Sequence, residues 1–260
     1  MFNFKEEKIK IKEKEKPQYD INNTIVIWLD TETTGLDAYR CDMITACFLI
    51  EENGEISDTL TMQVQPFAWE NISKEAEKVH GITSTMMIDF KKPEKSFIED
   101  LLPFLRENYN GKQFILAGQN IAFDRKHLNA YWGKCKSKLS GITYYGIDML
   151  YKLSSVDLWF NVHMIDCMYL GRFCQKKGLT NFINKATGKK SVKLEVMCDE
   201  LNIEYDSHDA IDDIIATKIV AHRLWNRIKN NKEALLEFEE QYPLMHDVFA
   251  SGLIKEMDET

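Results

Sequence analysis

Residues 25–36 read Ile-Val-Ile-Trp-Leu-Asp-Thr-Glu-Thr-Thr-Gly-Leu, an apolar run that ends in two carboxylates and then breaks at a glycine. A short apolar run bounded by turn signals is typical of a buried strand. Because side chains alternate across a strand, Asp30 and Glu32 should leave the sheet on the same side. Neighbouring carboxylates repel each other, and a divalent cation such as Mg²⁺ or Mn²⁺ would cancel that repulsion. The alternative interpretation is a polar strand end before a glycine turn.

Two further segments place carboxylates at the ends of predicted elements. Asp124 comes soon after the apolar run 114–118, which puts it past a buried strand and near the start of a helix. Asp213 belongs to His208-Asp-Ala-Ile-Asp-Asp213, which opens a helix with apolar residues at helical spacing. If this helix packs by its apolar face, Asp213 lies near the core and His208 lies at or just before the first turn.

Together the three segments resemble the motifs of the DEDDh branch of the DEDD 3′-to-5′ exonucleases, the family that includes the proofreading epsilon subunit of bacterial DNA polymerase III. The resemblance spans about residues 23–226 and implies an enzyme, a phosphodiester hydrolase. Weaker similarities lie between the motifs, at Val79-His-Gly-Ile-Thr83 and from Ile165-Asp166 to Leu170-Gly-Arg172. The motifs themselves are Asp-x-Glu-Thr-Thr-Gly-Leu at 30–36, Asn-x-x-Phe-Asp at 120–124 and His-x-Ala-x-x-Asp at 208–213.

The resemblance implies chemical roles for five residues. Asp30, Glu32, Asp124 and Asp213 would hold two divalent cations, Mg²⁺ or Mn²⁺, with the scissile phosphate between them. One cation would lower the pKa of a bound water, and the other would stabilise the leaving 3′ oxygen. His208 would orient and deprotonate that water, a task that suits a side chain titrating near neutrality.

The resemblance also implies which residues meet the substrate. The end of the first motif would contact the terminal nucleotide, and the second motif would supply supporting and packing residues. His80, in a predicted exposed loop, would either reach the substrate or be solvated. The candidate substrate-binding residues are Thr33, Gly35, Leu36, His80, Asn120 and Phe123.

A sister branch of the family has Tyr in place of His, at a Tyr-x-x-x-Asp spacing that Tyr205 and Asp209 satisfy. We favour His208 with Asp213, because Ala210 also matches and Asp209 would lie at the frayed start of the helix. Ser207 or Asp209 would then be the N-cap. Under this interpretation, replacing Tyr205 with Phe leaves turnover nearly intact.

The remaining patterns predict an α/β fold in a single domain. Asn53-Gly54 signals a hairpin, and an amphipathic helix over 94–109 should be kinked at Pro103. A strand meander followed by alternating strands and helices indicates a mixed sheet covered by helices. The resemblance sharpens this to a ribonuclease H-like fold, a mixed five-stranded sheet flanked by helices. The predicted strands are 24–31, 43–50, 59–65, 114–118 and about 162–167.

The predicted organisation has three parts. Residues 1–20 alternate Lys and Glu and read as a charged flexible tail. The exonuclease domain follows at 21–228, and a C-terminal helical extension at 229–260 should break near Pro243. Residues 136–160 are rich in aromatic side chains, which could form a stacking platform for bases. We favour a loop folded back onto the core.

The formal net charge is −8, which disfavours wrapping a long duplex and fits a grip on a few nucleotides through bound metal ions. Positive charge is concentrated in one run, which is either a solvated face or a guide for the phosphate backbone. This run contains no Asp or Glu and consists of Arg172, Lys176, Lys177, Lys185, Lys189, Lys190 and Lys193.

The composition predicts a soluble, cytoplasmic protein without a membrane partner. No apolar stretch approaches about 18 residues, and the charged N-terminus lacks the pattern of a signal peptide. The six cysteines form no Cys-x-x-Cys pair, so we expect reduced core thiols.

The leading hypothesis is a 3′-to-5′ exonuclease that releases nucleoside monophosphates from single-stranded or frayed DNA ends, as in replication proofreading. A DNA polymerase or a sliding clamp is a possible partner, since Gln241-Tyr-Pro-Leu-Met245 faintly resembles a clamp-binding peptide. An alternative substrate is RNA ends or short oligoribonucleotides, because recognition of the 2′-hydroxyl depends on few contacts. A third hypothesis is a catalytically silent adaptor, which the complete set of carboxylates weakens.

Overall fold

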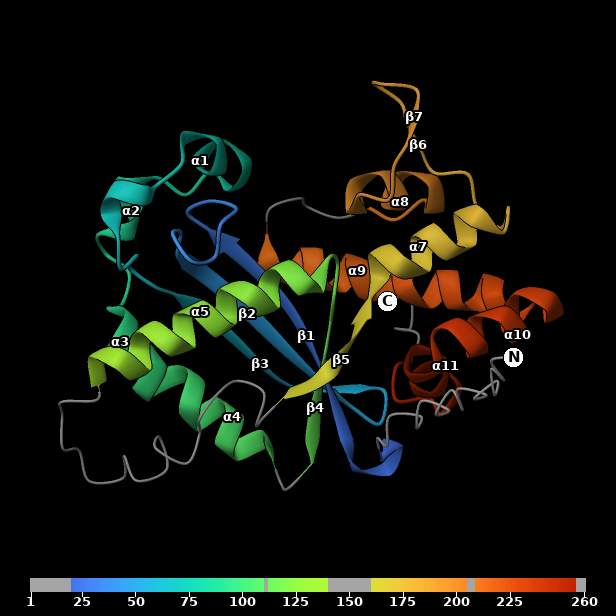
Figure 1. Ribbon diagram of the computed structural model, residues 1–260, viewed down its shortest axis with the longest axis horizontal. Helices are drawn as coiled ribbons and strands as arrows, with labels where there is room; N and C mark the ends of the chain where they lie inside the picture. The colour runs from blue at the N-terminus through green and yellow to red at the C-terminus, as the bar shows by residue number, and fades with distance from the viewer. Residues whose placement is uncertain (1–19, 110–111, 140–159, 205–208, 256–260) are drawn as a thin grey trace, which may run out of the picture.

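The computed structural model describes residues 20–109, 112–139, 160–204 and 209–255 (Figure 1). Some of the sequence predictions lie outside these residues. They concern the charged tail up to residue 19, most of the aromatic segment 136–160, and the loop with Tyr205, Ser207 and His208.

The described chain folds around a mixed five-stranded sheet with the order β3-β2-β1-β4-β5. β2 is antiparallel to β1 and β3, whereas β4 is parallel to β1 and β5. The predicted ribonuclease H-like arrangement of a mixed sheet flanked by helices is confirmed. The strands are β1 (Thr24–Thr33), β2 (Met43–Glu52), β3 (Glu55–Gln63), β4 (Gln113–Gly118) and β5 (Phe160–Asp166).

Asn53 and Gly54 form the predicted hairpin turn between β2 and β3. Both residues have positive φ, 55° and 82°, as a two-residue type I′ turn requires. The tight turn places Glu55 opposite Glu52. β3 therefore begins at Glu55, earlier than the predicted start at residue 59.

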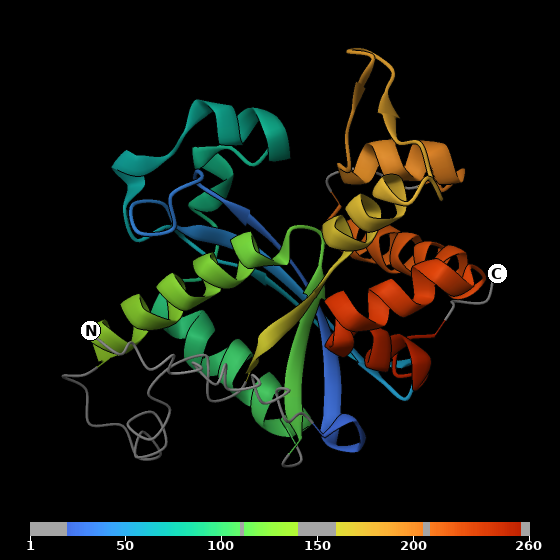
Figure 2. The same ribbon diagram turned by 45° about the vertical axis from the view of Figure 1, so that its right-hand side comes forward.

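β1 is buried on both faces, which explains its uninterrupted apolar run. Val26 and Trp28 belong to one hydrophobic core, and Ile25, Ile27 and Leu29 belong to the other. Helices cover each core, so the end of β1 is held between two layers (Figures 1 and 2). The first core is covered by α7 (Cys167–Lys176), α8 (Leu194–Leu201), α9 (Ala210–Lys229), α10 (Lys232–Gln241) and α11 (Pro243–Ala250), and the second by α4 (Leu102–Tyr109) and α5 (Ile121–Leu139).

The predicted helix over 94–109 consists of three consecutive pieces. They are α3 (Pro93–Ser96), a π-helical turn η3 (Phe97–Leu101) and α4. Pro103 lacks an N–H group and its ring clashes with the carbonyl of the preceding turn. A wider π turn directly before the proline therefore replaces the simple kink that the sequence predicts.

Shorter elements complete the described chain. α1 and the β6–β7 hairpin stand on opposite sides of the carboxyl end of β1 (Figure 2). α10 ends and α11 begins around Pro243, where the sequence predicts a break. These shorter elements are η1 (Ile21–Asn23), η2 (Trp69–Asn71), α1 (Lys74–His80), α2 (Ser84–Met87), β6 (Ile183–Asn184) and β7 (Lys189–Lys190).

All six cysteines are free, and only Cys41 is not fully buried, in agreement with reduced core thiols. None of the helices in the described ranges is both long enough and apolar enough to cross a membrane.

Candidate active site

The carboxyl end of β1 carries the first two candidate carboxylates. Asp30 and Glu32 are half-buried, while Thr31 between them is buried, the alternation that a strand predicts. The β1–β2 register shifts between Glu32 and Thr33, so regular pairing ends directly after the two carboxylates.

Asp124 is fixed to the end of β1 by two hydrogen bonds. It lies in the first turn of α5 and is buried, with only 4% of its surface exposed. The backbone N–H and the hydroxyl of Thr31 both donate to Asp124 Oδ1, over 3.0 and 2.7 Å. Donation to a carboxylate is a strong, charge-assisted interaction. Thr31 therefore connects the second motif to the first.

Asp213 reaches the same place from the opposite layer. It lies in the first turn of α9, which packs on β1 and begins at the N-cap Asp209. The Asp209 side chain accepts from the N–H groups of Ile211 and Asp212. Asp209 is thus occupied as the cap, one of the two residues that the sequence offers for this position.

Burial, and then the charge of neighbouring carboxylates, raises the pKa of three of the four acids. Burial, followed by the charge of Asp213, raises the pKa of Asp30 to about 7. Burial, followed by the charges of Asp30 and Asp213, raises the pKa of Glu32 to about 8. Burial and the charge of Asp30 also raise the pKa of Asp124 well above its ordinary value. Three distant chain segments therefore bring together four acids that repel each other when ionised.

This donor set fits divalent cations in its chemistry. Four carboxylates offer only hard oxygen ligands, the kind that Mg²⁺ and Mn²⁺ prefer. In the described part of the chain, no three acidic, histidine or cysteine side chains converge closely enough to hold one ion as they stand. A bound cation would offset the mutual repulsion of the ionised carboxylates.

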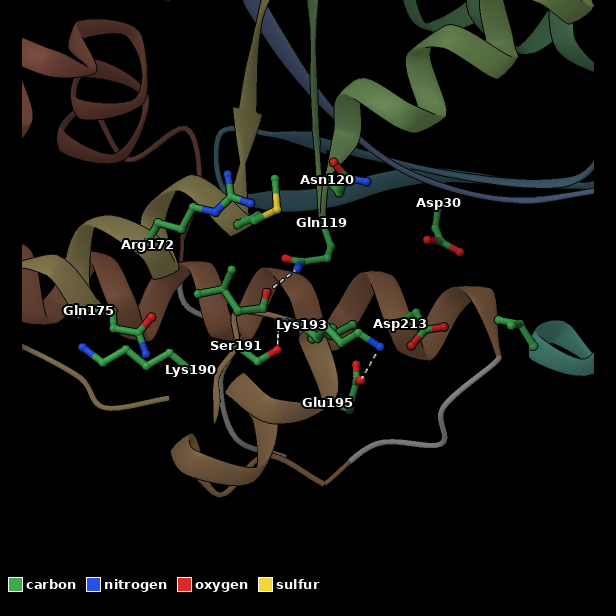
Figure 3. A pocket seen from close by; sticks show the side chains of 14 residues that line it. Asp30, Gln119, Asn120, Arg172, Gln175, Lys190, Ser191, Lys193, Glu195 and Asp213 are labelled. Carbon is green, nitrogen blue, oxygen red and sulfur yellow. Dashed lines mark hydrogen bonds and ion pairs between the residues drawn. The ribbon is translucent and has the colours of Figure 1, made fainter. Parts of the chain in front are cut away.

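Three of the four carboxylates line two cavities that share a residue. Asp30 and Asp213 line a cavity of about 1140 Å³ (Figure 3), and Glu32 lines a second one of about 780 Å³. Val79 lines both cavities. A bound chain that crosses from one cavity to the other would pass the carboxylates.

Five of the six predicted substrate-binding residues line the smaller cavity, and Asn120 lines the larger one. Several further lining residues were not among the predicted substrate contacts; they include Val79 and Gln119, each of which directly precedes a predicted one. The five residues of the smaller cavity are Thr33, Gly35, Leu36, His80 and Phe123.

The loop after β1 and helix α1 each present an apolar side chain beside the smaller cavity. Gly35 is required there, since a Cβ at this position would lie 2.7 Å from Cys41 Sγ. The Thr33 hydroxyl donates to the carbonyl of Gly35 over 2.9 Å. Leu36 is 88% exposed at the tip of this loop, and Val79 faces the same cavity with 60% of its surface exposed.

His80 departs from its prediction as a residue of an exposed loop. It is the last residue of α1 and only 9% exposed. Its Nδ1 accepts from the N–H of Ile82 over 3.0 Å. The sequence missed this burial because α1 ends in a left-handed cap at Gly81, which folds the chain back over the ring.

Asn120 and Phe123 support the start of α5. Asn120 has a φ of 56°, which asparagine tolerates better than most residues. Its N–H donates to Asp166 Oδ1 over 3.0 Å, and the same oxygen caps α7 through Met168. Phe123 packs against His127, with ring centroids 4.5 Å apart. His208 lies outside the described residues, so the structure does not place it.

Comparison with known proteins gives a consistent family match. The RNase T family model, described as an exonuclease, matches residues 27–221. The chain is 25% identical to Ribonuclease T from Vibrio campbellii over 119 residues, which covers 42% of this chain and 56% of that protein. It is 26% identical to Ribonuclease T from Vibrio vulnificus, also over 119 residues, with 42% and 55% covered.

Solved structures of Exonuclease I share the fold. The E. coli enzyme in complex with a dT13 oligonucleotide matches with a TM-score of 0.60 and 16% identity, over 87% of this chain and 46% of that one. Exonuclease I from Methylocaldum szegediense gives 0.56 and 20%, over 87% and 43%. The chain thus spans about half the length of the relatives it matches.

Proposed function

The chain belongs to the RNase T family of exonucleases, and on this basis we propose that it is a metal-dependent 3′-to-5′ exonuclease that releases nucleoside monophosphates from nucleic acid ends. One observation carries the proposal. Carboxylates from three separate segments meet at the end of β1: Asp124 accepts two hydrogen bonds from Thr31, which lies between Asp30 and Glu32, and Asp213 lines the same cavity as Asp30.

In this proposal the four carboxylates hold two divalent cations, Mg²⁺ or Mn²⁺. When bound, such cations supply an activated water and neutralise charge at the scissile phosphate. The protein supplies the oxygen ligands and holds Asp124 in place through Thr31. His208 is proposed as the general base, because it precedes α9 at the motif spacing.

The smaller cavity is proposed to hold the terminal nucleoside. Its volume of about 780 Å³ lies in the usual range of ligand pockets. Exposed apolar side chains favour contact with the face of a base, and Leu36 and Val79 supply them. Thr33, Gly35, His80 and Phe123 complete the proposed contacts, and Asn120 supports them from the adjoining cavity.

Single-stranded or frayed DNA is the proposed substrate, in a role like the proofreading of the epsilon subunit, with a polymerase or a sliding clamp as a possible partner. Solved Exonuclease I structures with the same fold include one bound to a DNA oligonucleotide. RNA ends are the second candidate, because Ribonuclease T relatives share sequence with this chain. A silent adaptor would not need the complete carboxylate set. We further propose an exonuclease domain at 21–228 with flanking extensions, and a cytoplasmic location.

The test is digestion of matched 5′-labelled DNA and RNA strands with Mg²⁺ or Mn²⁺. We expect a ladder that shortens from the 3′ end, strongest on DNA, and none with Asp30→Asn. A ladder on RNA alone would select the second candidate. No digestion of either strand by the unmodified protein would leave the adaptor.

A further inference from the structure

The larger cavity is lined by carboxylates and by basic side chains (Figure 3). Besides Asp30 and Asp213, its lining includes Arg172, Lys190 and Lys193. These three residues come from α7, from β7 and from the N-cap of α8. One cavity therefore joins the candidate catalytic centre to positive charge from three separate elements.

Specific residues hold the segment 190–195, which carries Lys190 and Lys193, against the rest of the structure. Gly171 allows α7 to approach the segment 190–195, since a Cβ there would lie 2.7 Å from Met197 Sδ and 3.3 Å from Val192 Cγ1. Gln119, directly after β4, donates from Nε2 to the carbonyl of Val192 over 2.8 Å. The segment is thus fixed against both the helix with Arg172 and the end of the sheet.

Ion pairs engage three lysines of the basic run between 172 and 193 away from the cavity. They are Lys176 and Lys177, both paired with Glu237, and Lys185, paired with Asp199. Within the described ranges, Lys190 and Arg172 form no ion pair. The Arg172 guanidinium nevertheless lies over the Tyr169 ring, 5.9 Å from its centroid, and its charge opposes the rise that burial causes in the pKa of Asp166.

Lys193 has a carboxylate partner that a phosphate can replace. Its Nζ lies 3.4 Å from Glu195 Oε1, and both side chains are more than half exposed. Such exposed pairs contribute at most about 1 kcal/mol. Glu195 also lines the cavity, so its carboxylate is the partner that a bound phosphate would displace from Lys193.

We propose that the larger cavity binds the phosphates of the strand on the 5′ side of the scissile bond, with Arg172, Lys190 and Lys193 as its cationic contacts. The proposal rests on the exonuclease function above. An enzyme that removes single nucleotides from a 3′ end has one nucleoside beyond the scissile phosphate and the whole strand before it. A cavity lined by the carboxylates and by three cations fits that longer side. Contacts to phosphates are independent of base sequence.

Lys189 offers a matched control. It neighbours Lys190 on β7 and is also exposed, but it does not line the cavity. Adjacent residues on a strand point to opposite faces. Lys189→Gln and Lys190→Gln therefore change the net charge equally, but only Lys190→Gln removes a contact of the proposed phosphate track, which consists of Arg172, Lys190 and Lys193.

The experiment measures the salt dependence of binding in an Asp30→Asn background, which prevents hydrolysis. The probes are fluorescein-labelled oligothymidylate and oligouridylate dodecamers, followed by anisotropy. Each lost phosphate contact should reduce the slope of log K against log salt by about 0.7. We expect this for Lys190→Gln, Arg172→Gln and Lys193→Gln on both probes, and no change for Lys189→Gln. Equal slopes for Lys190→Gln and Lys189→Gln would overturn the track.

A kinetic comparison separates this proposal from the function on which it rests. With Asp30 intact, a longer strand should be cut more efficiently than a dinucleotide, and Lys190→Gln should reduce that advantage in kcat/KM. If the protein digests 3′ ends but the three substitutions leave the salt dependence of binding unchanged, only the proposed phosphate track is wrong. If it digests no 3′ end, the exonuclease function itself is wrong.

Discussion

Substituting Lys218 should lower the free energy of unfolding more than the substitution of an exposed, ion-paired lysine does. Its side chain is 2% exposed, and its ammonium lies 2.6 Å from Oε1 of Glu51, whose side chain is fully buried. Glu51 also accepts from the indole N–H of Trp28 over 2.8 Å and from the N–H of Lys255 over 3.0 Å. This cluster joins α9, β2, β1 and the chain after α11. Asp213 and Asp30 lie on two of these elements.

Lys218→Met removes the ammonium and leaves a buried carboxylate with only two neutral donors. Loss of one partner of a buried ion pair costs about 3–5 kcal/mol. At roughly 2–4 °C per kcal/mol for a chain of this size, Tm should fall by about 6–20 °C. Urea unfolding, followed by tryptophan fluorescence, measures the free energy directly.

Two further variants make the test specific. Lys185→Met breaks the exposed pair with Asp199, in which the side chains are 78% and 60% exposed, and should cost less than about 1 kcal/mol. Glu51→Gln combined with Lys218→Met removes both charges and keeps an acceptor for Trp28, so it should recover much of the loss. A cost below about 1 kcal/mol for Lys218→Met would refute the reasoning, because breaking a buried pair costs more.

Other consequences concern the site itself. Thr31→Val removes a buried donor to Asp124 and should cost about 1–3 kcal/mol in urea unfolding, whereas Thr31→Ser should not. Burial raises the pKa of Asp30 from 3.8 to about 7. At any pH between these two values, the native state therefore binds more protons than the unfolded chain. The stability of the metal-free protein should therefore fall as pH rises from about 4 to 7, and Mn²⁺ should flatten this dependence in thermal unfolding; a flat metal-free profile would contradict it. Gly35→Ala should raise the KM for 3′ ends by displacing Cys41, and Cys41→Ala should restore it; an unchanged KM in the single variant would contradict the close packing.

Much of the fold follows from local sequence signals. The apolar run of β1 and the Asn53-Gly54 turn each act over a few residues, so period and turn chemistry predict them. Pro103 predicts a disturbance of its helix, but the π turn that accommodates it depends on how the flanking helical pieces pack. The start of β3 was misplaced, because a two-residue turn extends pairing into a polar segment.

The candidate site also combines features that local sequence predicts with features that only the tertiary structure reveals. Spacing along β1 predicts that Asp30 and Glu32 share a side, and the structure places Asp213 near them. The bonds from Thr31 to Asp124 join residues 93 positions apart, which no local pattern records. Lys218 likewise reads as a solvated helix residue until Glu51 is found beside it.

Calorimetric titration with Mn²⁺ near neutral pH tests the central claim most directly. We predict uptake of two ions per chain with release of protons, because the raised carboxylate pKa values leave protons for the metal to displace. Asp213→Asn should weaken this uptake, while Asp212→Asn, on the same helical turn, should not. No uptake at millimolar Mn²⁺, or equal uptake by both variants, would contradict the proposal that these four carboxylates form the metal centre.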